Sequence, residues 1–405
     1  MAKLGSPWWR ELTPAKKRRK YPVCRGETTA DVVVIGGGLT GSVAACVLAR
    51  GGLDVILLEA DRLADAGTAA GLGCVIPDAG PSFTGLHDAL GLRATKTAWR
   101  LARTSARDLA AAIKRLGIRC DAAPAPFVTD AAYADRTADL RREQSARKAA
   151  GFAAPWLKGA ELDTLLASEA LGAIRVDGAT TLDPVRAALG FAKAAEAAGA
   201  RIFESSPVRR TRFDRQRAEV VLADAKIVTS GVFVATGSPG RLFTQLRRHV
   251  REQDAFVVVT DPLETAMKRQ TGRRQAVVTE VSEAPHWLRW LKGDRAMFAG
   301  AAGPVVPARQ LDRVLIQKTG QLMYELSLRH PVISGLPADA GWPLRVVSTA
   351  DGLPWIGAHR NFPFHFFALA LGWHGETFAW HAARAALRHF TGAAAKEDSV
   401  FGFGR

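Results

Sequence analysis

A run of β-branched residues that leads directly into a glycine-rich turn constrains this chain more than any other feature. Residues 32–35 read Val-Val-Val-Ile, which is typical of a strand buried on both faces of a parallel sheet. The next elements form one series: the turn Gly36-x-Gly38-x-x-Gly41, a helical stretch over 42–50, a second strand over 55–58 and an acidic residue, Glu59. This order predicts a unit that binds a dinucleotide: a strand, a glycine-rich turn, a helix, a second strand and an acidic residue.

Each residue of this pattern has a physical reason. Gly36 permits the tight turn, Gly38 lets the backbone approach a pyrophosphate, and Gly41 lets the helix pack closely on the strand. The phosphates then lie at the helix N-terminus, where free N–H groups and the helix dipole favour negative charge. Glu59 accepts hydrogen bonds from the adenosine ribose hydroxyls in this arrangement. An ordinary glycine-rich turn would lack this context, but the pattern alone does not distinguish FAD from NAD.

The composition narrows the class of protein. The chain has 405 residues, of which 48 % are hydrophobic and 23 % are charged. Such a composition is globular and excludes wholesale disorder, collagen and coiled coil, and the length suits two interleaved domains. The four cysteines are too few for a disulfide scaffold, and none of them forms a C-x-x-C pair. We therefore predict no metal site and a reducing, cytoplasmic location.

The positive charge of the chain is unevenly distributed. The formal net charge is +16, and residues 1–25 carry eight basic side chains against one acidic side chain. We interpret residues 1–29 as an irregular, solvated basic arm in preference to a dedicated nucleic-acid surface. Nucleic acid, and peripheral membrane contact through this arm, are the alternatives, because both present anions.

No membrane or targeting segment is expected. The basic run at 16–20 is followed by polar residues and not by an apolar stretch. Residues 32–49 lack a charge over eighteen positions, which is the lower limit for a membrane span, but the dinucleotide unit accounts for them. We therefore expect no transmembrane span.

Periodicity and capping residues predict the remaining elements. We expect an amphipathic helix with a basic stripe over 93–116, and a helix that starts at Asp183-Pro184 and ends at Gly199. Other helices are predicted over 130–150, 310–329 and 376–390, and strands over 201–204, 208–213, 218–222, 227–236, 256–260, 276–281, 286–291, 296–299 and 364–371.

Six blocks in order along the chain resemble the FAD-dependent amine and amino-acid oxidoreductases typified by D-amino-acid oxidase, sarcosine oxidase and glycine oxidase. The blocks are DVVVIGGGLTG (31–41), VILLEADRL (55–63), LDPVRAALGFAKAAEAAGARI (182–202), VFVATG (232–237), TADGLPWIG (349–357) and LGWHGETF (371–378). The resemblance covers residues 30–405.

The resemblance implies an α/β fold with two domains. One is a Rossmann-like FAD-binding domain with a parallel sheet and a β-meander, and the other is an α+β substrate domain whose mixed sheet roofs the isoalloxazine. The predicted division is a basic arm at 1–29, an FAD-binding domain at 30–90, 150–250 and 345–405, a helical insertion at 91–149 and a substrate domain at 251–344.

The resemblance also implies which residues hold FAD. Residues 372–377 would place backbone N–H groups and a helix N-terminus against the flavin pyrimidine edge, which favours the negative charge of reduced flavin. The implied contacts are Gly36, Gly38, Leu39, Thr40, Gly41, Glu59, Ala60, Arg62, Thr68, Gly73, Val208, Thr236, Gly237, Gly352, Gly372, Trp373, His374, Gly375, Glu376 and Thr377.

Three departures from the family pattern bear on the cofactor. The segment 67–73 lacks the arginine and asparagine found in many members, His374 stands where asparagine is usual, and Glu376 replaces an aliphatic residue. Glu376 would oppose the effect of the helix dipole on reduced flavin unless it points outward. Some members bind FAD covalently, but no cysteine follows Cys120, so we predict non-covalent FAD.

Three residues are candidates for the substrate side. By resemblance, Arg289 on the roof strand and Arg345 would hold a substrate carboxylate, since a guanidinium binds this group bidentately. His374 would act as a base, a charge partner of the substrate or a flavin contact. The alternatives are a surface or ion-paired arginine and a hydrogen-bonding loop histidine. Trp287 and Trp290 form either an aromatic cage or ordinary sheet packing.

The resemblance implies oxidation of a C–N bond in a small amine or amino acid by hydride transfer to flavin N5. Oxygen would be the electron acceptor of an oxidase, and a quinone or carrier protein that of a dehydrogenase. Two alternatives stay open. One is oxidation of an aminomethyl group on a modified transfer RNA, which the basic charge would fit. The other is a non-catalytic flavoprotein that serves as a scaffold or assembly factor.

Overall fold

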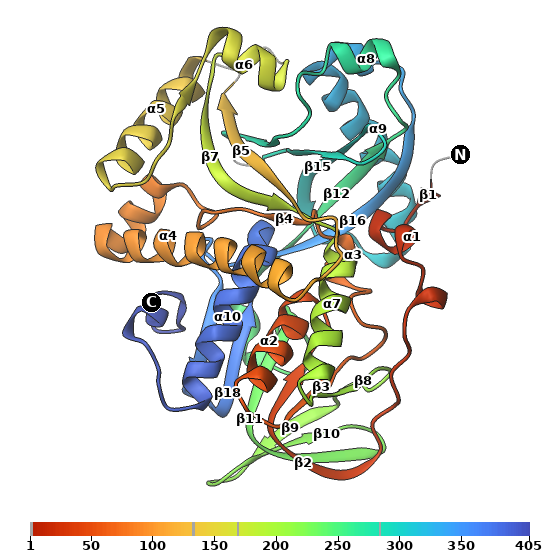
Figure 1. Cartoon of the computed structure of the whole chain (residues 1–405), viewed down its shortest axis with the longest axis vertical. Coiled ribbons are helices and arrows are strands. Elements are labelled where there is room, and N and C mark those ends of the chain that lie inside the picture. The colour runs from red at the N-terminus through yellow and green to blue at the C-terminus, as the bar shows by residue number, and fades with distance from the viewer. Residues whose placement is uncertain (1–2, 132–133, 168–169, 283–284) are drawn as a thin grey trace.

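Two sheets organise the part of the chain that the computed structural model describes, residues 3–131, 134–167, 170–282 and 285–405. The parallel sheet lies in the lower half of Figure 1 and the mixed sheet in the upper half, so the two are stacked along the long axis of the molecule. The chain passes between them several times.

The parallel sheet carries the predicted dinucleotide unit. Its strands are, in spatial order, β17 (Trp355–His359), β18 (Phe362–Leu369), β11 (Ala225–Gly237), β2 (Gly26–Ile35), β3 (Val55–Leu58) and β8 (Arg201–Phe203), with β10 (Ala218–Val221) and β9 (Arg210–Phe213) extending from β11. The five strands from β18 to β8 run parallel, and β17 is an antiparallel edge. The predicted parallel sheet with its β-meander is confirmed.

Strand β2 is buried on both faces, as its β-branched run predicts. Val32 and Val34 pack beneath the helices, whereas Val33 and Ile35 face the meander. The helices that cover the first face are α2 (Leu39–Arg50), α7 (Pro184–Ala197) and α10 (Gly375–Phe390). Asp183 caps α7 by accepting a hydrogen bond from the Arg186 N–H at 2.9 Å, which is why this helix starts where the sequence predicts.

The second sheet is mixed, also as predicted. Its strands are, in spatial order, β1 (Lys3–Leu4), β16 (Ala338–Ser348), β12 (Arg251–Thr260), β15 (Arg295–Pro304), β14 (Trp287–Leu291), β13 (Val277–Glu280), β5 (Ala123–Ala131), β7 (Gly172–Thr181) and β4 (Cys74–Val75), with β6 (Trp156–Leu157) beside β7. The pairs β1–β16 and β13–β5 are parallel and the others are antiparallel.

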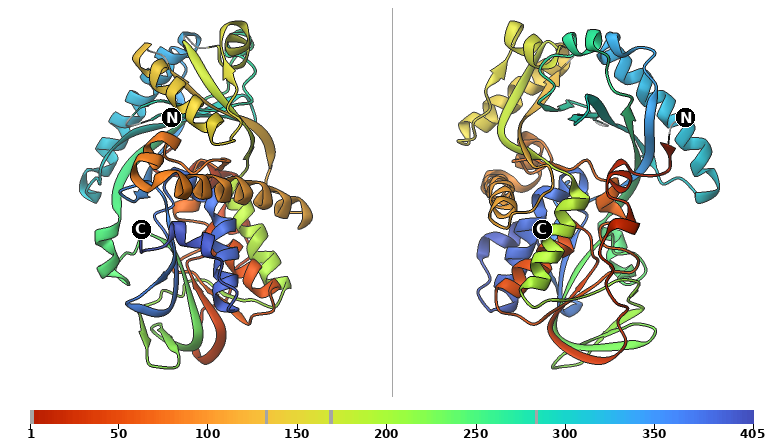
Figure 2. Two further views of the ribbon diagram at one scale, coloured as in Figure 1. Left: turned by 90° about the vertical axis from the view of Figure 1, so that its left-hand side faces the viewer. Right: turned by 45° about the vertical axis from the view of Figure 1, so that its right-hand side comes forward.

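Helices cover the mixed sheet on its outer face and separate it from the parallel sheet on the other. Helix α9 (Leu311–Arg329) lies on the outer face of the sheet in the right-hand view of Figure 2. Its residues Leu315, Leu322 and Leu326 are buried in the core on this side. Helix α4 (Phe83–Arg115) crosses between the layers and is interrupted at Gly91, where φ is +77°. The remaining helices are α1 (Trp8–Leu12), α3 (Gly67–Ala70), α5 (Ala134–Ala149), α6 (Gly159–Leu166) and α8 (Thr265–Arg269), with short 3₁₀ turns at Ala15–Lys17, Thr244–His249, Ala308–Gln310, Pro331–Ile333, Gly372–His374 and Lys396–Phe401.

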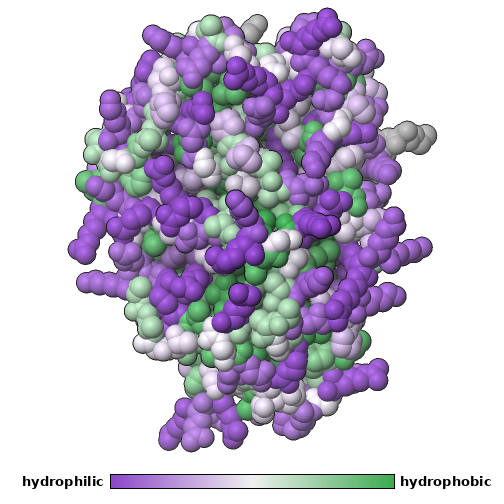
Figure 3. Space-filling view, in the orientation of Figure 1, coloured by the Kyte–Doolittle hydropathy of each residue, from purple (hydrophilic) through white to green (hydrophobic). Residues whose placement is uncertain are grey.

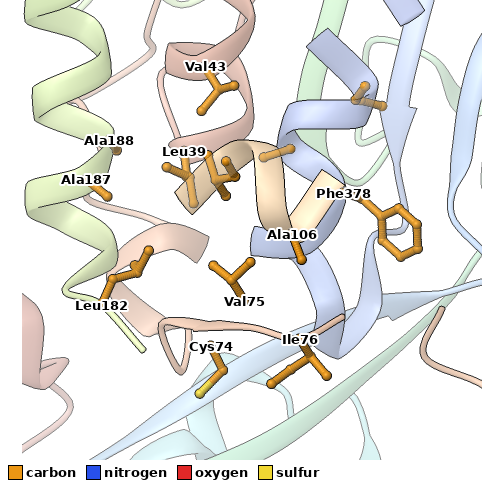
Figure 4. Close-up of a cluster of buried hydrophobic side chains, with 14 of the residues drawn as sticks. Leu39, Val43, Cys74, Val75, Ile76, Ala106, Leu182, Ala187, Ala188 and Phe378 are labelled. Carbon is orange, nitrogen blue, oxygen red and sulfur yellow. The ribbon is translucent and has the colours of Figure 1, made fainter. Parts of the chain in front are cut away.

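Small and aliphatic side chains fill the junction of the two layers (Figure 4). Leu39 and Val43 of α2, Ala187 of α7 and Phe378 of α10 surround the strand β4. Thr377 fixes this junction, because its Oγ1 accepts a hydrogen bond from the Ile76 N–H and donates one to the Ile76 carbonyl, both at 2.8 Å. The start of α10 is therefore held against the crossing segment.

Parts of the predicted FAD-binding domain lie in the mixed sheet: strand β7, and the end of β16, which the predicted boundary at 345 divides. The segment 150–181 was assigned to the FAD-binding domain, but β7 pairs along the length of β5 in the mixed sheet. The pair joins strands that are separated in the chain by α5 and α6, and such a non-local pairing leaves no periodic signal in the sequence. We propose to move the boundary at 150 to the start of α7.

The N-terminal arm is irregular over residues 18–25, but some of its side chains are buried in the protein and not solvated. Trp9 of α1 is only 3 % exposed, and its indole N–H donates to the Gly71 carbonyl at 2.8 Å. Arg18 is also buried, and it donates to the Thr13 carbonyl at 2.6 Å and to Asp65 Oδ1 at 2.8 Å. The prediction was wrong here because these partners lie far along the chain or in loops, where no sequence pattern reveals them.

Hydrophilic side chains cover most of the outline of the face in Figure 3, and apolar residues are visible between them in its lower middle. None of the helices within the described ranges combines the length and the apolarity needed to cross a membrane. The same residues include no group of three or more histidine, cysteine, aspartate or glutamate side chains arranged to hold a metal ion.

Candidate active site

A cavity of about 390 Å³ runs from the glycine-rich turn after β2 to the first turn of α10. The predicted cofactor residues that line it are Gly36, Gly38, Leu39, Thr40, Glu59, Ala60, Thr68, Val208, Thr236, Gly237, Gly372, Trp373, Gly375 and Glu376. Residues from six separate stretches of the chain thus meet in one elongated space, which the sequence placed together only through the family resemblance.

The glycine-rich turn is a cradle that side chains would fill. Gly36 has φ +107°, and a Cβ there would lie 2.6 Å from the Ala235 carbonyl oxygen. A Cβ at Gly41 would lie 1.8 Å from the Gly36 oxygen, and one at Gly38 would lie 2.9 Å from Thr68 Oγ1. These contacts leave room for glycine alone and bring the backbone to the surface of the cavity. The turn therefore fits a dinucleotide pyrophosphate at the start of α2.

Glu59 lines the end of the cavity beside the glycine-rich turn. Its Oε2 accepts a hydrogen bond from the Gly37 N–H at 2.6 Å, and its Oε1 accepts one from the Asp61 N–H at 3.0 Å. Burial raises the pKa of Glu59 and outweighs the opposite effect of these hydrogen bonds. Each carboxylate oxygen retains a second lone pair, so Glu59 still has capacity for ribose hydroxyls.

Glu376 lies at the opposite end and does not point outward. Its carboxyl group lines the cavity, and Oε1 accepts a hydrogen bond from the Gly73 N–H at 3.0 Å. Burial raises the pKa of Glu376 and outweighs the backbone hydrogen bonds and the nearby Arg289. The two departures from the family pattern, the segment 67–73 and Glu376, are therefore partners in one contact.

His374 is turned away from the cavity. Its Nε2 lies 2.9 Å from Asp78 Oδ1, and its ring meets the ring of Trp287 edge-on at 5.5 Å. Burial works to raise the pKa of Asp78, but His374 and Arg147 outweigh it and the pKa lies below its usual value. The imidazole is thus buried against Asp78 behind the loop, whereas its neighbours Trp373 and Gly375 line the cavity.

Arg289 lies on the face of β14 that points toward the parallel sheet, but outside this cavity. Its Nη1 donates to the carbonyls of Leu72, Gly73 (2.8 Å) and Leu182 (2.9 Å). The guanidinium also stacks over the Trp9 ring, with Cζ 4.9 Å from its centroid. Burial lowers the pKa of Arg289, and nearby anionic groups oppose this effect.

Arg345 lines the cavity but is engaged by two carboxylates. Its Nε donates to Asp254 Oδ1 at 2.6 Å and its Nη1 to Glu252 Oε2 at 3.2 Å. The neighbouring residues Leu344 and Val346 line the cavity as well, so this part of β16 forms the roof of the site. The structure therefore brings Arg345 to the cofactor cavity and does not bring Arg289 or the His374 ring there.

The two tryptophans of β14 do not face one another. The ring of Trp287 stacks on Phe127 and on Trp373, with ring centroids 5.7 and 5.9 Å apart. The ring of Trp290 meets His330 on the other face of the sheet, with centroids 6.1 Å apart. Trp287 is three positions before Trp290, and the alternation of a strand puts residues at odd spacing on opposite faces. Sheet packing, not a shared aromatic cage, describes this pair.

Several predicted contacts lie beside the cavity and not in its wall: Gly41, Arg62, Gly73, Gly352 and Thr377. Arg62, for example, pairs with Glu204 at 2.6 Å. The wall also contains residues that the sequence reasoning missed: Ile35, Leu58, Ala66, Gly67, Gly71, Leu72, Pro184, Ser206, Pro207, Ala235, Leu242, Leu344, Val346, Ala368 and Leu371. Many of them are next to a predicted contact, so extending each motif by one or two residues would have found them.

A family model described as "FAD dependent oxidoreductase" (DAO) matches residues 31–388. The chain is 24 % identical over 370 residues to the probable oxidoreductase OrdL of Haemophilus influenzae, covering 88 % of this chain and 81 % of that protein. It is 23 % identical over 352 residues to the gamma-glutamylputrescine oxidoreductase of Escherichia coli K12, covering 85 % and 80 %.

A solved structure shows the same fold. The glycine oxidase from Geobacillus kaustophilus superposes with a TM-score of 0.75 at 19 % sequence identity, and the match covers 93 % of this chain and 99 % of that one. The fold class that the sequence blocks predict is thereby confirmed.

Proposed function

The chain belongs to the DAO family of FAD-dependent oxidoreductases, and on that premise we propose that it oxidises a C–N bond of a small amine or amino acid. Bound FAD would accept a hydride at N5 from the carbon next to nitrogen, leaving a C=N bond that water hydrolyses. The acceptor that reoxidises the flavin is oxygen or a quinone or carrier protein. The relatives support the substrate class, since one is named for gamma-glutamylputrescine and one solved structure is a glycine oxidase.

One observation carries this proposal: a single cavity connects the dinucleotide turn to the first turn of α10 beneath the mixed sheet. Glu59 and the turn residues Gly36 and Gly38 would hold the adenosine and pyrophosphate at one end. The flavin ring would then reach the opposite end, where Gly375 begins α10 and Glu376 and Trp373 line the wall. The N–H groups of that first turn would stabilise negative charge on the ring.

The residues of the roof bear on the substrate. Leu344 and Val346 present apolar surface, and the charge of Arg345 is shared with Asp254 and Glu252. A substrate carboxylate would therefore compete with two carboxylates for this guanidinium. The amine nitrogen and its apolar substituent, more than a carboxylate, are what the described lining suits.

The cavity wall also supports non-covalent FAD. The described lining residues include no cysteine and no histidine, and the ring of His374 is turned toward Asp78. We expect acid precipitation of the holoprotein to release all flavin into the supernatant. Flavin that stays with the precipitate would contradict this point. The four free, buried cysteines support the proposed cytoplasmic location, because reducing compartments keep thiols unpaired.

The test is an absorption spectrum of the purified protein followed by anaerobic addition of amines and amino acids. We expect a flavin spectrum that bleaches with one chemical class, and readmission of oxygen then separates an oxidase from a dehydrogenase. Pairs that differ only in the carboxylate, such as benzylamine and phenylglycine, show which group is recognised. A flavin that no compound bleaches would overturn the small-substrate proposal, and a protein that takes up no FAD would overturn the enzyme.

A further inference from the structure

A second cavity of about 370 Å³ lies between α1, the start of α7 and the ends of strands in the mixed sheet. Its lining residues are Trp8, Trp9, Leu12, Asp121, Ala123, Pro124, Thr181, Asp183, Arg186, Arg274, Gln275, Ala276, Arg289, Trp290, Leu291 and Lys292. The proposed redox function uses none of this space. A cavity of this volume is in the range that proteins use for small molecules.

One segment of backbone separates this cavity from the cofactor cavity. Gly71 and Leu72 of this segment line the cofactor cavity, and residues 71–73 are held by two side chains that line the second cavity. Trp9 donates its indole N–H to the Gly71 carbonyl at 2.8 Å, and Arg289 donates to the carbonyls of Leu72 and Gly73. The two cavities are neighbours but share no side chain in their described linings.

The second cavity has an excess of positive charge. Four cationic side chains line it, Arg186, Arg274, Arg289 and Lys292, against the carboxylates of Asp121 and Asp183. This cavity therefore favours an anionic ligand.

Arg289 gives the strongest reason for an anion. It is 7 % exposed, and no carboxylate among the described residues lies within ion-pair distance of it. Its Nε is buried and makes no hydrogen bond to any described residue. Burying a charge with neutral partners alone is costly, and leaving one of its donors without a partner adds to that cost. A carboxylate in the cavity would neutralise the guanidinium charge and accept a hydrogen bond from Nε.

Lys292 and Arg186 share one exposed partner, whereas Arg186 also lies 3.4 Å from the buried Asp183 and Arg274 lies 3.6 Å from Asp294. Lys292 lies 2.7 Å from Asp121, but the lysine side chain is 79 % exposed. Arg186 lies 3.1 Å from the same carboxylate and is 38 % exposed. Exposed ion pairs such as these are worth little, so a ligand carboxylate can replace Asp121 as their partner at small cost.

Part of the cavity wall is apolar. Trp8 and Trp9 come from α1, and Pro124, Ala276 and Leu291 come from the strand ends. Aromatic rings of this kind supply area against which an apolar body packs. The cavity therefore combines one buried cation, a cationic mouth and an aromatic wall.

We propose that this cavity is a second ligand site, distinct from the redox site, that binds a small monocarboxylate with an apolar body. The carboxylate lies beside Arg289 and the apolar body lies against the two tryptophans of α1. This site explains why the N-terminal arm folds back onto the protein, since α1 forms one wall of it. It also gives Arg289 a carboxylate partner without placing it in the cofactor cavity.

The test is isothermal titration calorimetry of the FAD-loaded protein with 3-phenylpropionate, and with 3-phenylpropionamide as its neutral counterpart. We expect the acid to bind at least tenfold more tightly than the amide, because only the acid offers charge to Arg289. Apoprotein and holoprotein should bind the acid with the same affinity. Equal affinities for acid and amide would overturn the proposal, and so would binding to the apoprotein alone, which would put the acid in the FAD cavity.

Variants locate the site. Arg274→Gln removes a cation of the lining, and its neighbour Arg273 is exposed and outside the lining, so Arg273→Gln is the matched control. We expect Arg274→Gln and Trp8→Ala each to weaken acid binding about fivefold or more, and Arg273→Gln to leave it unchanged. Arg289→Met should abolish binding of the acid. If this variant does not fold, Arg274→Gln and Trp8→Ala still test the site. If neither Arg274→Gln nor Trp8→Ala changes the affinity for the acid, the proposed site is wrong. Flavin reduction enters none of these readouts, so failure of the site is distinguishable from failure of the proposed redox function.

Discussion

The carboxylate of Glu376 accepts a hydrogen bond from the Gly73 N–H, with Oε1 3.0 Å from the nitrogen and 303 positions between the two residues. This contact ties the first turn of α10 to the segment that forms the wall of the cofactor cavity. It also places a carboxyl group at the end of the cavity where the flavin ring is proposed to lie. Because the helix dipole and a carboxylate act on a reduced flavin with opposite signs, we expect protonation of Glu376 to change the potential of a flavin bound there.

Glu376→Gln should raise the midpoint potential of bound FAD at alkaline pH. The amide keeps an acceptor oxygen for the Gly73 N–H but removes a negative charge that disfavours the reduced flavin. We expect a rise of about 30 mV, which for a two-electron couple is 1.4 kcal/mol. The difference should shrink as the pH falls through the raised pKa of Glu376, because both side chains are then neutral. Reductive titration with reference dyes measures it, and a difference that does not change with pH would contradict this role.

Gly38→Val should prevent FAD binding while the protein stays folded. A Cβ at this position lies 2.9 Å from Thr68 Oγ1, which accepts a hydrogen bond from the Leu39 N–H at 2.8 Å. The added methyl groups would occupy the space where a pyrophosphate approaches the backbone. We expect the FAD dissociation constant to rise at least a hundredfold, or about 2.7 kcal/mol. Quenching of FAD fluorescence gives the affinity, and circular dichroism of the apoprotein verifies folding.

Glu59→Gln should weaken FAD binding more mildly. The amide can accept one hydrogen bond from the Gly37 or Asp61 N–H but loses the charge that strengthens bonds to ribose hydroxyls. A rise of about tenfold in the dissociation constant, or 1.4 kcal/mol, is expected. Glu161→Gln on the exposed face of α6 is the control and should bind FAD as the wild type does. Equal effects of the two substitutions would show that Glu59 does not contact the cofactor.

His381→Met should flatten the loss of stability in acid. His381 is 5 % exposed, and burial lowers its pKa to about 4, with Asp398 opposing the effect. Between the ordinary histidine pKa of about 6.5 and that value, the unfolded chain binds one more proton here than the folded chain does. The free energy of unfolding therefore falls as the pH falls, by about 1.4 kcal/mol per pH unit for this one group.

Urea unfolding of the apoprotein at a series of pH values from neutral to about 4.5 measures this slope. In His381→Met the pH dependence of the free energy of unfolding should lose the contribution of this one histidine. The control His87→Met, at an exposed position, should keep the wild-type slope. A methionine variant with an unchanged slope would place the titration elsewhere in the chain.

Gly320→Ala should stabilise the protein. Gly320 lies in the exposed face of α9, and a Cβ there would meet no atom within 4 Å. Alanine restricts the unfolded chain and favours the helix, so we expect a gain of about 0.5–1 kcal/mol in the free energy of unfolding. Gly341→Ala is the contrast, since its Cβ would lie 2.7 Å from Thr319 Oγ1 across the same helix–sheet contact and should lower stability. Urea midpoints of both variants test the pair.

The cofactor half of the site was predictable because its signal is local. Gly36, Gly38 and Glu59 lie within one strand-turn-helix-strand unit, and each has a backbone reason to be the residue that it is. The substrate half was not predictable in the same way. Arg289 and Arg345 could be named from resemblance, but their partners, the 72–73 carbonyls and Asp254, come from other strands and loops.

The sequence by itself determined the dinucleotide unit, the parallel sheet around it and the family to which the chain belongs, because hydrophobic periodicity and glycine spacing act over a few residues at a time. Only the tertiary structure decided that His374 faces Asp78, that Glu376 faces the cavity and binds Gly73, and that the basic arm folds back to form a second cavity. These outcomes depend on contacts between residues far apart in the chain. Such contacts form when buried polar groups find partners in three dimensions, and no local pattern encodes that choice.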